Sequence, residues 1–244
     1  MFSFFTKKYH IADYLHGLTD FHCHLLPEID DGAQSPEVSL EMIGEYKSLG
    51  YKGVIATPHI MEDFYSNNTA IILAKLDEFQ NFLSESGFTD FSVKAAAEYM
   101  MDKQFDSLVL KKDLLPLVGK KVLVEMSYLQ KMIYTDSQLF ELKQQGFTPI
   151  LAHPERYVYL KDRTEVLDFK KKGCYLQLNL LSLSQHYGSQ VHHKALDLLC
   201  NGHYDILGTD AHNPRHLKAI KQITLTKKQL PFFEALVEKT RNFC

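Results

Sequence analysis

Short apolar runs alternate along this chain with longer stretches in which apolar residues recur at helical spacing. A run of about four to seven apolar residues bounded by glycine or proline is typical of a buried strand, and a period of about 3.6 residues is typical of a helix that packs one face on a sheet. The predicted strands are Leu18–His24, Gly53–Thr57, Phe91–Ala97, Lys121–Val124, Thr148–Ala152, Cys174–Leu178 and Asp205–Gly208.

Helical stretches separate these strands, and the first shows clear boundary signals. Ser35 is a typical N-cap, Pro36 suits the first turn, and Gly50 suits the position after the last turn. Seven strand–helix units without an obvious linker predict a parallel sheet with helices outside, closed or nearly closed into a barrel. The predicted helices are Val38–Leu49, Thr69–Leu83, Asp102–Leu110, Asp136–Gln145, Arg163–Lys172, Val191–Asn201, Pro214–Gln222 and Thr226–Arg241.

Composition narrows the function without defining it. A chain of 244 residues with 45% hydrophobic and 23% charged residues is ordinary for a globular protein. The net charge of −3 gives no electrostatic case for nucleic acid or an anionic membrane. No Gly-x-Gly-x-x-Gly follows the first strand, which argues against a dinucleotide site.

Cysteines and targeting signals favour a reduced, cytoplasmic protein. The four cysteines are scattered without a Cys-x-x-Cys pair, so the sequence indicates neither a disulfide framework nor a thiolate zinc site. No run reaches the ~20 apolar residues of a membrane span. The N-terminal sequence MFSFFTKKYH has the wrong order and length for a signal peptide. It is expected to pack against the domain, with contact to a membrane surface as the alternative.

The segment Asp20-Phe21-His22-Cys23-His24 carries the strongest chemical signal. Strand side chains repeat with period two, so Asp20, His22 and His24 are expected to point the same way. One such histidine is often only a hydrogen-bonded polar residue near a strand end. A pair in Asp-x-His-x-His favours metal ligation, because buried imidazoles are costly unless something binds them.

Ionisable side chains also stand at or just past the ends of most other predicted strands. In a barrel of parallel strands these ends converge on one rim, so five histidines and four carboxylates are expected to share one bowl. Nine such groups exceed what one metal takes and predict two or three divalent ions. A set without thiolates suits manganese, iron or zinc and has too many histidines for calcium. The nine are His22, His24, Asp31, His59, Glu98, Glu125, His153, Asp210 and His212.

These motifs resemble the PHP (polymerase and histidinol phosphatase) superfamily across almost the whole chain. Within it, the chain resembles the CpsB/CapC-type manganese-dependent tyrosine phosphatases of bacteria. The resemblance implies a distorted seven-stranded (β/α)7 barrel with its active site at the C-terminal rim of the strands. It covers residues 18–244 and leaves residues 1–17 as an N-terminal extension. It rests on Asp20–Pro27, Ile29–Ala33, Ala56–His59, Ala96–Tyr99, His153–Tyr157 and Gly208–Asn213.

The resemblance also implies roles for individual residues. One metal is assigned to His22, His24, Glu98 and Asp210, a second to Glu98, Glu125 and His153, and a third to Asp31, His59 and His212. Arg156 matches a family arginine that holds the substrate phosphate. Arg215 lies near the position of a second family arginine, at a spacing that looks shifted. An ordinary surface ion pair with Glu155 or with an acidic residue of a helix is the alternative for Arg156.

Phosphomonoester hydrolysis fits this set of groups. Adjacent metals can activate a water as hydroxide for attack on phosphorus, while an arginine donates two parallel hydrogen bonds to the phosphoryl group. A cysteine-based phosphatase is excluded, because Cys23, Cys174 and Cys200 are followed six positions later by Ile29, Leu180 and Ile206 rather than arginine. Aromatic residues that could line a phosphotyrosine cleft, or simply pack, are Phe64, Tyr65, Tyr128, Tyr134, Tyr157 and Tyr159.

The resemblance implies one partner and leaves rival functions open. It implies a bacterial tyrosine autokinase with a phosphotyrosine-bearing tail as partner, and capsule or exopolysaccharide synthesis as the process. The main alternative is a small-molecule phosphomonoesterase such as histidinol phosphatase. A nuclease is disfavoured by the acidic charge. A decayed, regulatory metal-binding domain is disfavoured by the complete set of nine groups.

Overall fold

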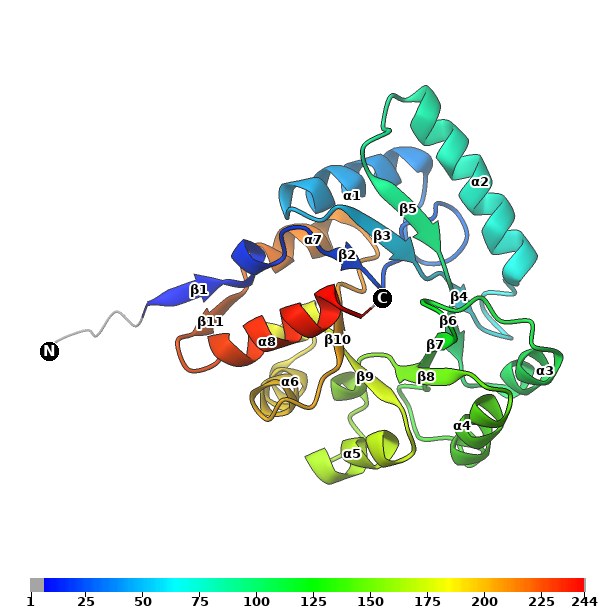
Figure 1. Ribbon diagram of the computed structural model, residues 1–244, viewed down its shortest axis with the longest axis vertical. Helices are drawn as coiled ribbons and strands as arrows, with labels where there is room; N and C mark the ends of the chain where they lie inside the picture. The colour runs from blue at the N-terminus through cyan, green and yellow to red at the C-terminus, as the bar shows by residue number, and fades with distance from the viewer. Residues whose placement is uncertain (1–6, 244) are drawn as a thin grey trace, which may run out of the picture.

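The computed structural model describes residues 7–243 as a curled parallel sheet with helices on its outer face (Figure 1). Six strands follow one another in the order β10-β9-β8-β7-β6-β4, and three more follow in the order β2-β3-β5. Every pair within these two sheets is parallel. Their bounds are β2 Thr19–Asp20, β3 Gly53–Ala56, β4 His59–Ile60, β5 Ser92–Ala95, β6 Glu98–Met100, β7 Lys121–Glu125, β8 Thr148–Leu151, β9 Tyr175–Asn179 and β10 Ile206–Gly208.

The predicted strands Gly53–Thr57 and Phe91–Ala97 are each followed at once by a second short strand. β3 pairs with β5. Both strands are then interrupted, and the strands that follow them, β4 and β6, pair with each other. Pro58 lies at the break and cannot donate a ladder hydrogen bond. Backbone bonds from Ala96 N to Ala56 O (2.8 Å) and from Glu98 N to Pro58 O (3.1 Å) hold the two breaks side by side.

The predicted first strand, Leu18–His24, is too long. Only Thr19–Asp20 pairs with β3, and the chain then turns to the segment after β10. There Cys23 bridges Ala211, and His24 N donates to Ala211 O at 3.0 Å. The switch of partner after Asp20 ends the ladder, which the apolar pattern alone does not show.

Helices follow the strands close to where periodicity predicts them. The Ser35 hydroxyl accepts from Val38 N at 3.4 Å, as expected of the predicted N-cap. The last prediction, Thr226–Arg241, is wrong at its start, because Thr224–Thr226 forms strand β11 and the helix begins at Leu230. The helices are α1 Pro36–Ser48, α2 Thr69–Glu85, α3 Lys103–Lys111, α4 Thr135–Gln144, α5 Arg163–Lys171, α6 Ser189–Cys200, α7 Pro214–Ile220 and α8 Leu230–Arg241.

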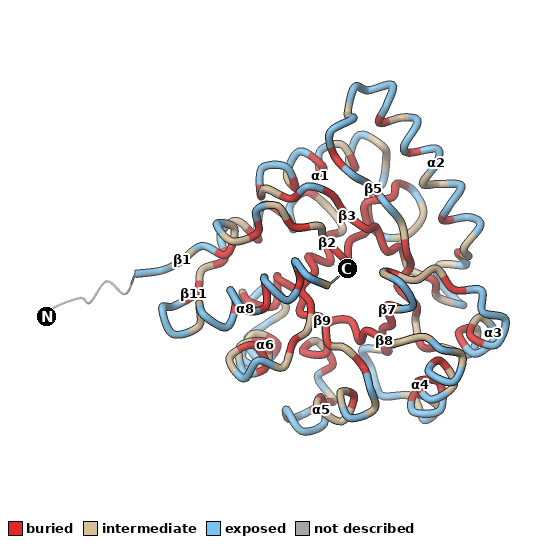
Figure 2. Tube along the Cα trace, viewed as in Figure 1, coloured by how far each residue is buried: buried red, intermediate tan, exposed pale blue. Residues whose placement is uncertain are grey.

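Two apolar layers flank the curled sheet, and most strand residues are buried, with β5 partly exposed (Figure 2). The larger core lies between the sheet and the helices. The smaller core joins residues of strands far apart in the sheet order, including Ile55 of β3, Leu123 of β7 and Ile206 of β10. Because these side chains meet across the curl, they fill its concave side. No helix in residues 7–243 is long and apolar enough to cross a membrane.

The segment before β2 packs on the same body. Strand β1 (Lys8–His10) pairs antiparallel with β11, and the short 3-10 helix Ile11–Tyr14 follows. Ile11 and Leu15 are completely buried in the larger core. The prediction that the N-terminal sequence MFSFFTKKYH packs against the domain is therefore confirmed for Lys8–His10. The aromatic run at residues 1–6 lies outside the described residues.

We expect Ile11→Ala to lower the free energy of unfolding by about 2–4 kcal/mol, since it removes a fully buried side chain and leaves a cavity. Asp13→Ala, an exposed change in the same helical turn, is the matched control and is expected to change stability by less than about 0.5 kcal/mol. Urea unfolding of the three proteins measures both values. Equal stability of Ile11→Ala and wild type would contradict the packing described for this segment.

Candidate metal centre

The structure brings the nine predicted ionisable residues together in one place. Eight of them form three overlapping groups in which one nitrogen or oxygen of each member lies within 4.8 Å of those of the others. His153 alone stands outside these groups, although it contacts one of them. The groups are His22, His24, Glu98 and Asp210; His24, Asp31, His59 and His212; and His59, Glu98 and Glu125.

The deepest group is completely buried. His22 Nε2 lies 3.1 Å from Glu98 Oε2 and 3.3 Å from Asp210 Oδ1. His24 Nε2 approaches the same two oxygens at 3.5 and 3.3 Å. Two imidazoles thus face two carboxylates, each ring presenting its Nε2. The period-two prediction holds for His22 and His24, but Asp20 turns away and bonds Tyr46 and Thr209 instead.

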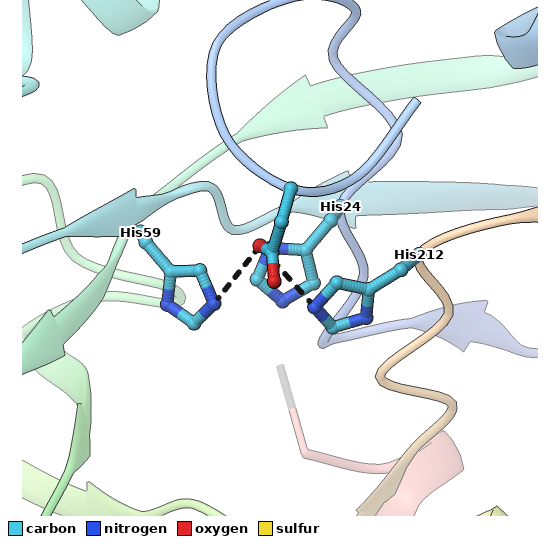
Figure 3. Close-up of side chains that lie close together, drawn as sticks. His24, His59 and His212 are labelled. Atoms are coloured by element: carbon cyan, nitrogen blue, oxygen red, sulfur yellow. Dashed lines mark ion pairs between the residues drawn. The ribbon is translucent and has the colours of Figure 1, made fainter. Parts of the chain in front are cut away.

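The outermost group surrounds an exposed carboxylate. Figure 3 shows the rings of His24, His59 and His212 around it. Asp31 Oδ1 lies 3.4 Å from His59 Nε2 and 3.6 Å from His212 Nε2. The Asp31 side chain is 50% exposed, so this group faces the solvent side of the cluster.

Glu98 and Glu125 connect the remaining side chains. His59 Nδ1 lies 3.0 Å from Glu125 Oε1 and 3.3 Å from Glu98 Oε2. His153 Nε2 lies 3.1 Å from Glu98 Oε1. The resemblance implies a set of Glu98, Glu125 and His153, whereas in the structure His59, and not His153, forms a group with both glutamates.

Several buried ligand-type atoms in the described chain lack a hydrogen-bond partner. A buried polar atom without a partner costs roughly 1–3 kcal/mol, so a cluster of them is unusual unless a ligand binds there. A nitrogen and oxygen set of this kind suits manganese, iron or zinc. The residues present therefore fit divalent metal ions. The atoms are His22 Nε2, His24 Nε2, His59 Nδ1, Glu98 Oε2 and Glu125 Oε1.

Two side chains outside the predicted nine orient the deepest histidines. Asp30 Oδ2 lies 2.7 Å from His24 Nδ1, and Gln177 Oε1 lies 3.0 Å from His22 Nδ1. A proton on each Nδ1 leaves Nε2 as a free lone pair that faces the cluster. Asp30 lies in the segment Ile29–Ala33 that carries the resemblance, but it is not among the nine predicted residues. Gln177 was missed, and its only signal was a polar residue within the apolar run Cys174–Leu178.

The backbone is strained at two of the nine residues. His153 (φ 34°) and Asp210 (φ 50°) both adopt the left-handed region, which costs a non-glycine residue about 1–3 kcal/mol. Such conformations persist where the surrounding structure holds them, and they concentrate at functional sites. Each residue follows a strand of the six-stranded sheet by two positions.

Arg156 lies at the cluster between two aromatic rings. Its guanidinium carbon is 4.6 Å from the ring centre of Tyr128 and 4.3 Å from that of Tyr187. Its Nη1 donates to Asp210 Oδ2 at 2.6 Å. Burial lowers the pKa of Arg156, but Tyr128 and Asp210 outweigh it and raise the pKa. The arginine therefore stays positively charged, and its guanidinium is held in place by the two rings.

The alternative for Arg156, a surface pair with Glu155 or a helix acid, is wrong, because its partner is the buried Asp210, which lies in no helix. Glu155 is buried and accepts hydrogen bonds from Tyr204 Oη and Asn179 N. The other predicted arginine, Arg215, is exposed in the first turn of α7 and is absent from the lining of the cavity at the cluster.

A cavity of about 270 Å³ opens over the cluster. Arg156 and seven of the nine ionisable residues line it, while His22 and His24 lie beneath. Of the aromatic residues singled out in the sequence, Phe64, Tyr65 and Tyr128 also line it. Tyr157 instead packs in the core, and Tyr159 donates to the Ser127 carbonyl at 3.0 Å.

Protons compete with metals for these imidazoles. Burial lowers the pKa of His24, but Asp30, Asp210 and Glu98 together outweigh it and raise the pKa well above the ordinary value. Burial also lowers the pKa of His59, but Glu125 raises it, to about 9. With only the protein groups present, both imidazoles are therefore in the protonated, positively charged form at pH 7.

We expect metal-free protein, prepared by treatment with a chelator, to release protons when it binds Mn²⁺ at pH 7.5. A raised pKa means that the proton is bound below it, so metal affinity should rise by about tenfold per pH unit for each displaced proton and level off above pH ~9. Titration with Mn²⁺ in weakly buffered indicator solution measures the protons released. Uptake without proton release, at an affinity equal at pH 7 and pH 9, would be the contrary result.

Comparison with known proteins agrees with this geometry. The model of the family described as capsular polysaccharide synthesis, CpsB/CapC, matches residues 18–228. The tyrosine-protein phosphatase YwqE of Bacillus subtilis is 28% identical over 198 residues, covering 80% of this chain and 78% of that protein. The putative tyrosine-protein phosphatase CapC of Staphylococcus aureus is 25% identical over 228 residues, covering 92% of this chain and 89% of that protein.

Solved structures share the fold. A chain from the crystal structures of YwqE of Bacillus subtilis and CpsB of Streptococcus pneumoniae, described as metal-dependent tyrosine phosphatases, superposes with a TM-score of 0.73 at 24% identity, covering 91% of this chain and 95% of that one. A histidinol phosphate phosphatase of Lactococcus lactis, solved with zinc, L-histidinol and phosphate, gives 0.52 at 16% identity, covering 93% and 94%. The family match spans most of the sequence and confirms the resemblance read from its motifs: this chain belongs to the CpsB/CapC family.

Proposed function

We propose that this protein is a metal-dependent phosphatase that hydrolyses phosphotyrosine in proteins. One observation carries the proposal. Buried imidazole and carboxylate atoms that lack a hydrogen-bond partner converge beneath a cavity that also exposes a fixed arginine. That combination holds cations and a phosphoryl group side by side. Membership of a family whose relatives are named tyrosine-protein phosphatases points to the same chemistry.

The three groups of ligand atoms suit three divalent ions, with manganese as the proposed metal and iron or zinc as substitutes. When bound, such ions lower the pKa of a water and neutralise phosphate oxygens. The deep group of His22, His24, Glu98 and Asp210 would hold one ion. His59, Glu98 and Glu125, beside His153, would hold a second. Asp31, His59 and His212, with His24 behind them, would hold a third.

The protein's own groups prepare the site for a phosphoryl group. Arg156 presents N–H donors to phosphate oxygens, and its contacts with the rings of Tyr128 and Tyr187 restrict its movement. Burial and the nearby His24 lower the pKa of His212 to about 4, so this imidazole is neutral at pH 7 and offers a lone pair. A tyrosine leaving group has a pKa of ~10 and departs with modest help.

The rim of the cavity favours an aromatic phosphate over a small polar one. Phe64, Tyr65 and Tyr128 line the walls, and Phe64 is 75% exposed. A phenyl ring that carries the phosphate can pack on these side chains. Histidinol phosphate is the main alternative substrate, because a histidinol phosphate phosphatase shares the fold.

We extend the proposal to the barrel, the natural substrate and the cellular process. We propose a distorted (β/α)7 barrel with the active site at the C-terminal rim of the strands, made by residues 18–244, with residues 1–17 as an extension. The natural substrate would be the phosphotyrosine tail of a bacterial tyrosine kinase. The protein would act in the cytoplasm and regulate capsule or exopolysaccharide synthesis, as the family description suggests.

Comparing substrates tests this proposal. Protein loaded with Mn²⁺ is assayed on a phosphotyrosine peptide, free phosphotyrosine and histidinol phosphate. We expect kcat/KM to be highest for the phosphotyrosine substrates by at least about tenfold. Protein that is fully metal-loaded by elemental analysis, yet hydrolyses histidinol phosphate and not phosphotyrosine, would refute the tyrosine phosphatase and support the small-molecule enzyme.

A further inference from the structure

A second cavity adjoins the one over the metal cluster. It measures about 250 Å³ and shares three lining residues, Met61, Phe64 and Met100, with the first. The two cavities are therefore separated only by a common wall of apolar side chains. A ligand held in the first can reach the second without crossing a polar barrier.

The lining of this second cavity is rich in methionine. Besides Met61 and Met100, it includes Met101 and Met132, and Tyr134 closes one side. Thioether side chains are flexible and polarisable, so they adapt to apolar groups of different shapes. Asp102 also lines it, but its carboxylate already accepts from Phe105 N at 3.0 Å and from Glu62 N at 2.8 Å. Little remains there for a polar ligand to bind.

Exposed apolar side chains belong to the segments that line this cavity. Phe64 is 75% exposed, and the segment that supplies Ser127 and Met132 to the lining also carries Leu129 and Ile133, which are 90% and 102% exposed. Large apolar side chains that gather at the surface beside a cavity mark a contact region for another molecule. Their position next to the proposed catalytic cavity indicates that the molecule is the substrate.

We propose that this methionine-lined cavity is a subsite for an apolar side chain of the substrate protein, one or two residues away from the phosphotyrosine. An extended peptide advances about 3.3 Å per residue, so a near neighbour of the phosphotyrosine reaches across one shared wall. Asp63 at the rim disfavours an acidic residue there. The proposal rests on the proposed function and adds the substrate class: a peptide with an apolar neighbour, rather than any phosphotyrosine.

Peptide variants test the subsite. Wild type is assayed on a glycine-flanked phosphotyrosine peptide and on versions with leucine or aspartate at positions −2, −1, +1 and +2. We expect leucine at one of these positions to raise kcat/KM by about tenfold, mainly through a lower KM, and aspartate there to lower it. Met132→Asp should bring the ratio of leucine to glycine peptide close to one, and Met132→Leu should keep it.

Leu110→Asp is the matched control, because Leu110 is an exposed apolar residue that lines neither cavity, and it should keep the wild-type ratio. No preference at any position, or a preference that persists in Met132→Asp, overturns the subsite. Free phosphotyrosine separates the two proposals: its hydrolysis without peptide preference removes only the subsite. Failure to hydrolyse any phosphotyrosine substrate removes the proposed function together with the subsite.

Discussion

Replacing Glu98 with glutamine is expected to lower kcat on a phosphotyrosine peptide by about a thousandfold, which corresponds to roughly 4 kcal/mol of lost transition-state stabilisation. Glu98 belongs to two of the three groups of ligand atoms. Its Oε2 faces His22, His24 and His59, and its Oε1 faces His153. An amide offers one acceptor and no charge in that position, so the cations lose a shared carboxylate.

The expected mechanism of the Glu98→Gln defect is loss of metal, and elemental analysis measures it directly. Glu62→Gln is the control, because Glu62 is an exposed carboxylate whose side chain lines neither cavity. Thermal unfolding checks that each variant remains folded. A Glu98→Gln protein with normal metal content and activity within tenfold of wild type would contradict the role given to this residue.

Arg156→Ala is expected to lower kcat/KM by about a hundredfold, and Arg156→Lys to recover less than about tenfold of that loss. The guanidinium lies over the rings of Tyr128 and Tyr187 and donates to Asp210. A lysine ammonium is a point charge that cannot donate two parallel hydrogen bonds to one phosphoryl group.

Inhibition by inorganic phosphate gives a second readout for Arg156. Both variants should require a higher phosphate concentration for half-inhibition than wild type. Arg163→Ala is the control, since this exposed arginine pairs with Asp197 at 3.2 Å and lines neither cavity. Wild-type kcat/KM and phosphate inhibition in Arg156→Lys would show that only the charge matters, contrary to the planar geometry described here.

The order of strands and helices, and the gathering of the nine ionisable residues, could be predicted from the sequence. Both follow from local rules. An apolar run bounded by glycine or proline predicts a strand, and residues just past parallel strands are carried to one edge of the sheet. His153 and Asp210 follow β8 and β10 in this way.

Contacts between distant parts of the chain could not be predicted. The early end of the first strand depends on Cys23 pairing with Ala211, and strand β11 exists because residues 8–10 lie beside it. Gln177 orients His22 across a wide separation in sequence, and its residue type alone carries no such signal. Tyr187 packs on Arg156, and nothing in the neighbouring sequence predicts that contact.

We expect the buried histidines and carboxylates to support catalysis by holding metal ions. Hydrolysis of a phosphotyrosine peptide is measured for wild type and His22→Ala as purified, after chelation, and after Mn²⁺ is added back. We predict that wild-type activity disappears with the chelator and returns with Mn²⁺, while His22→Ala stays inactive throughout. Activity that survives complete removal of metal, or an active His22→Ala protein, would contradict metal-dependent catalysis at this cluster.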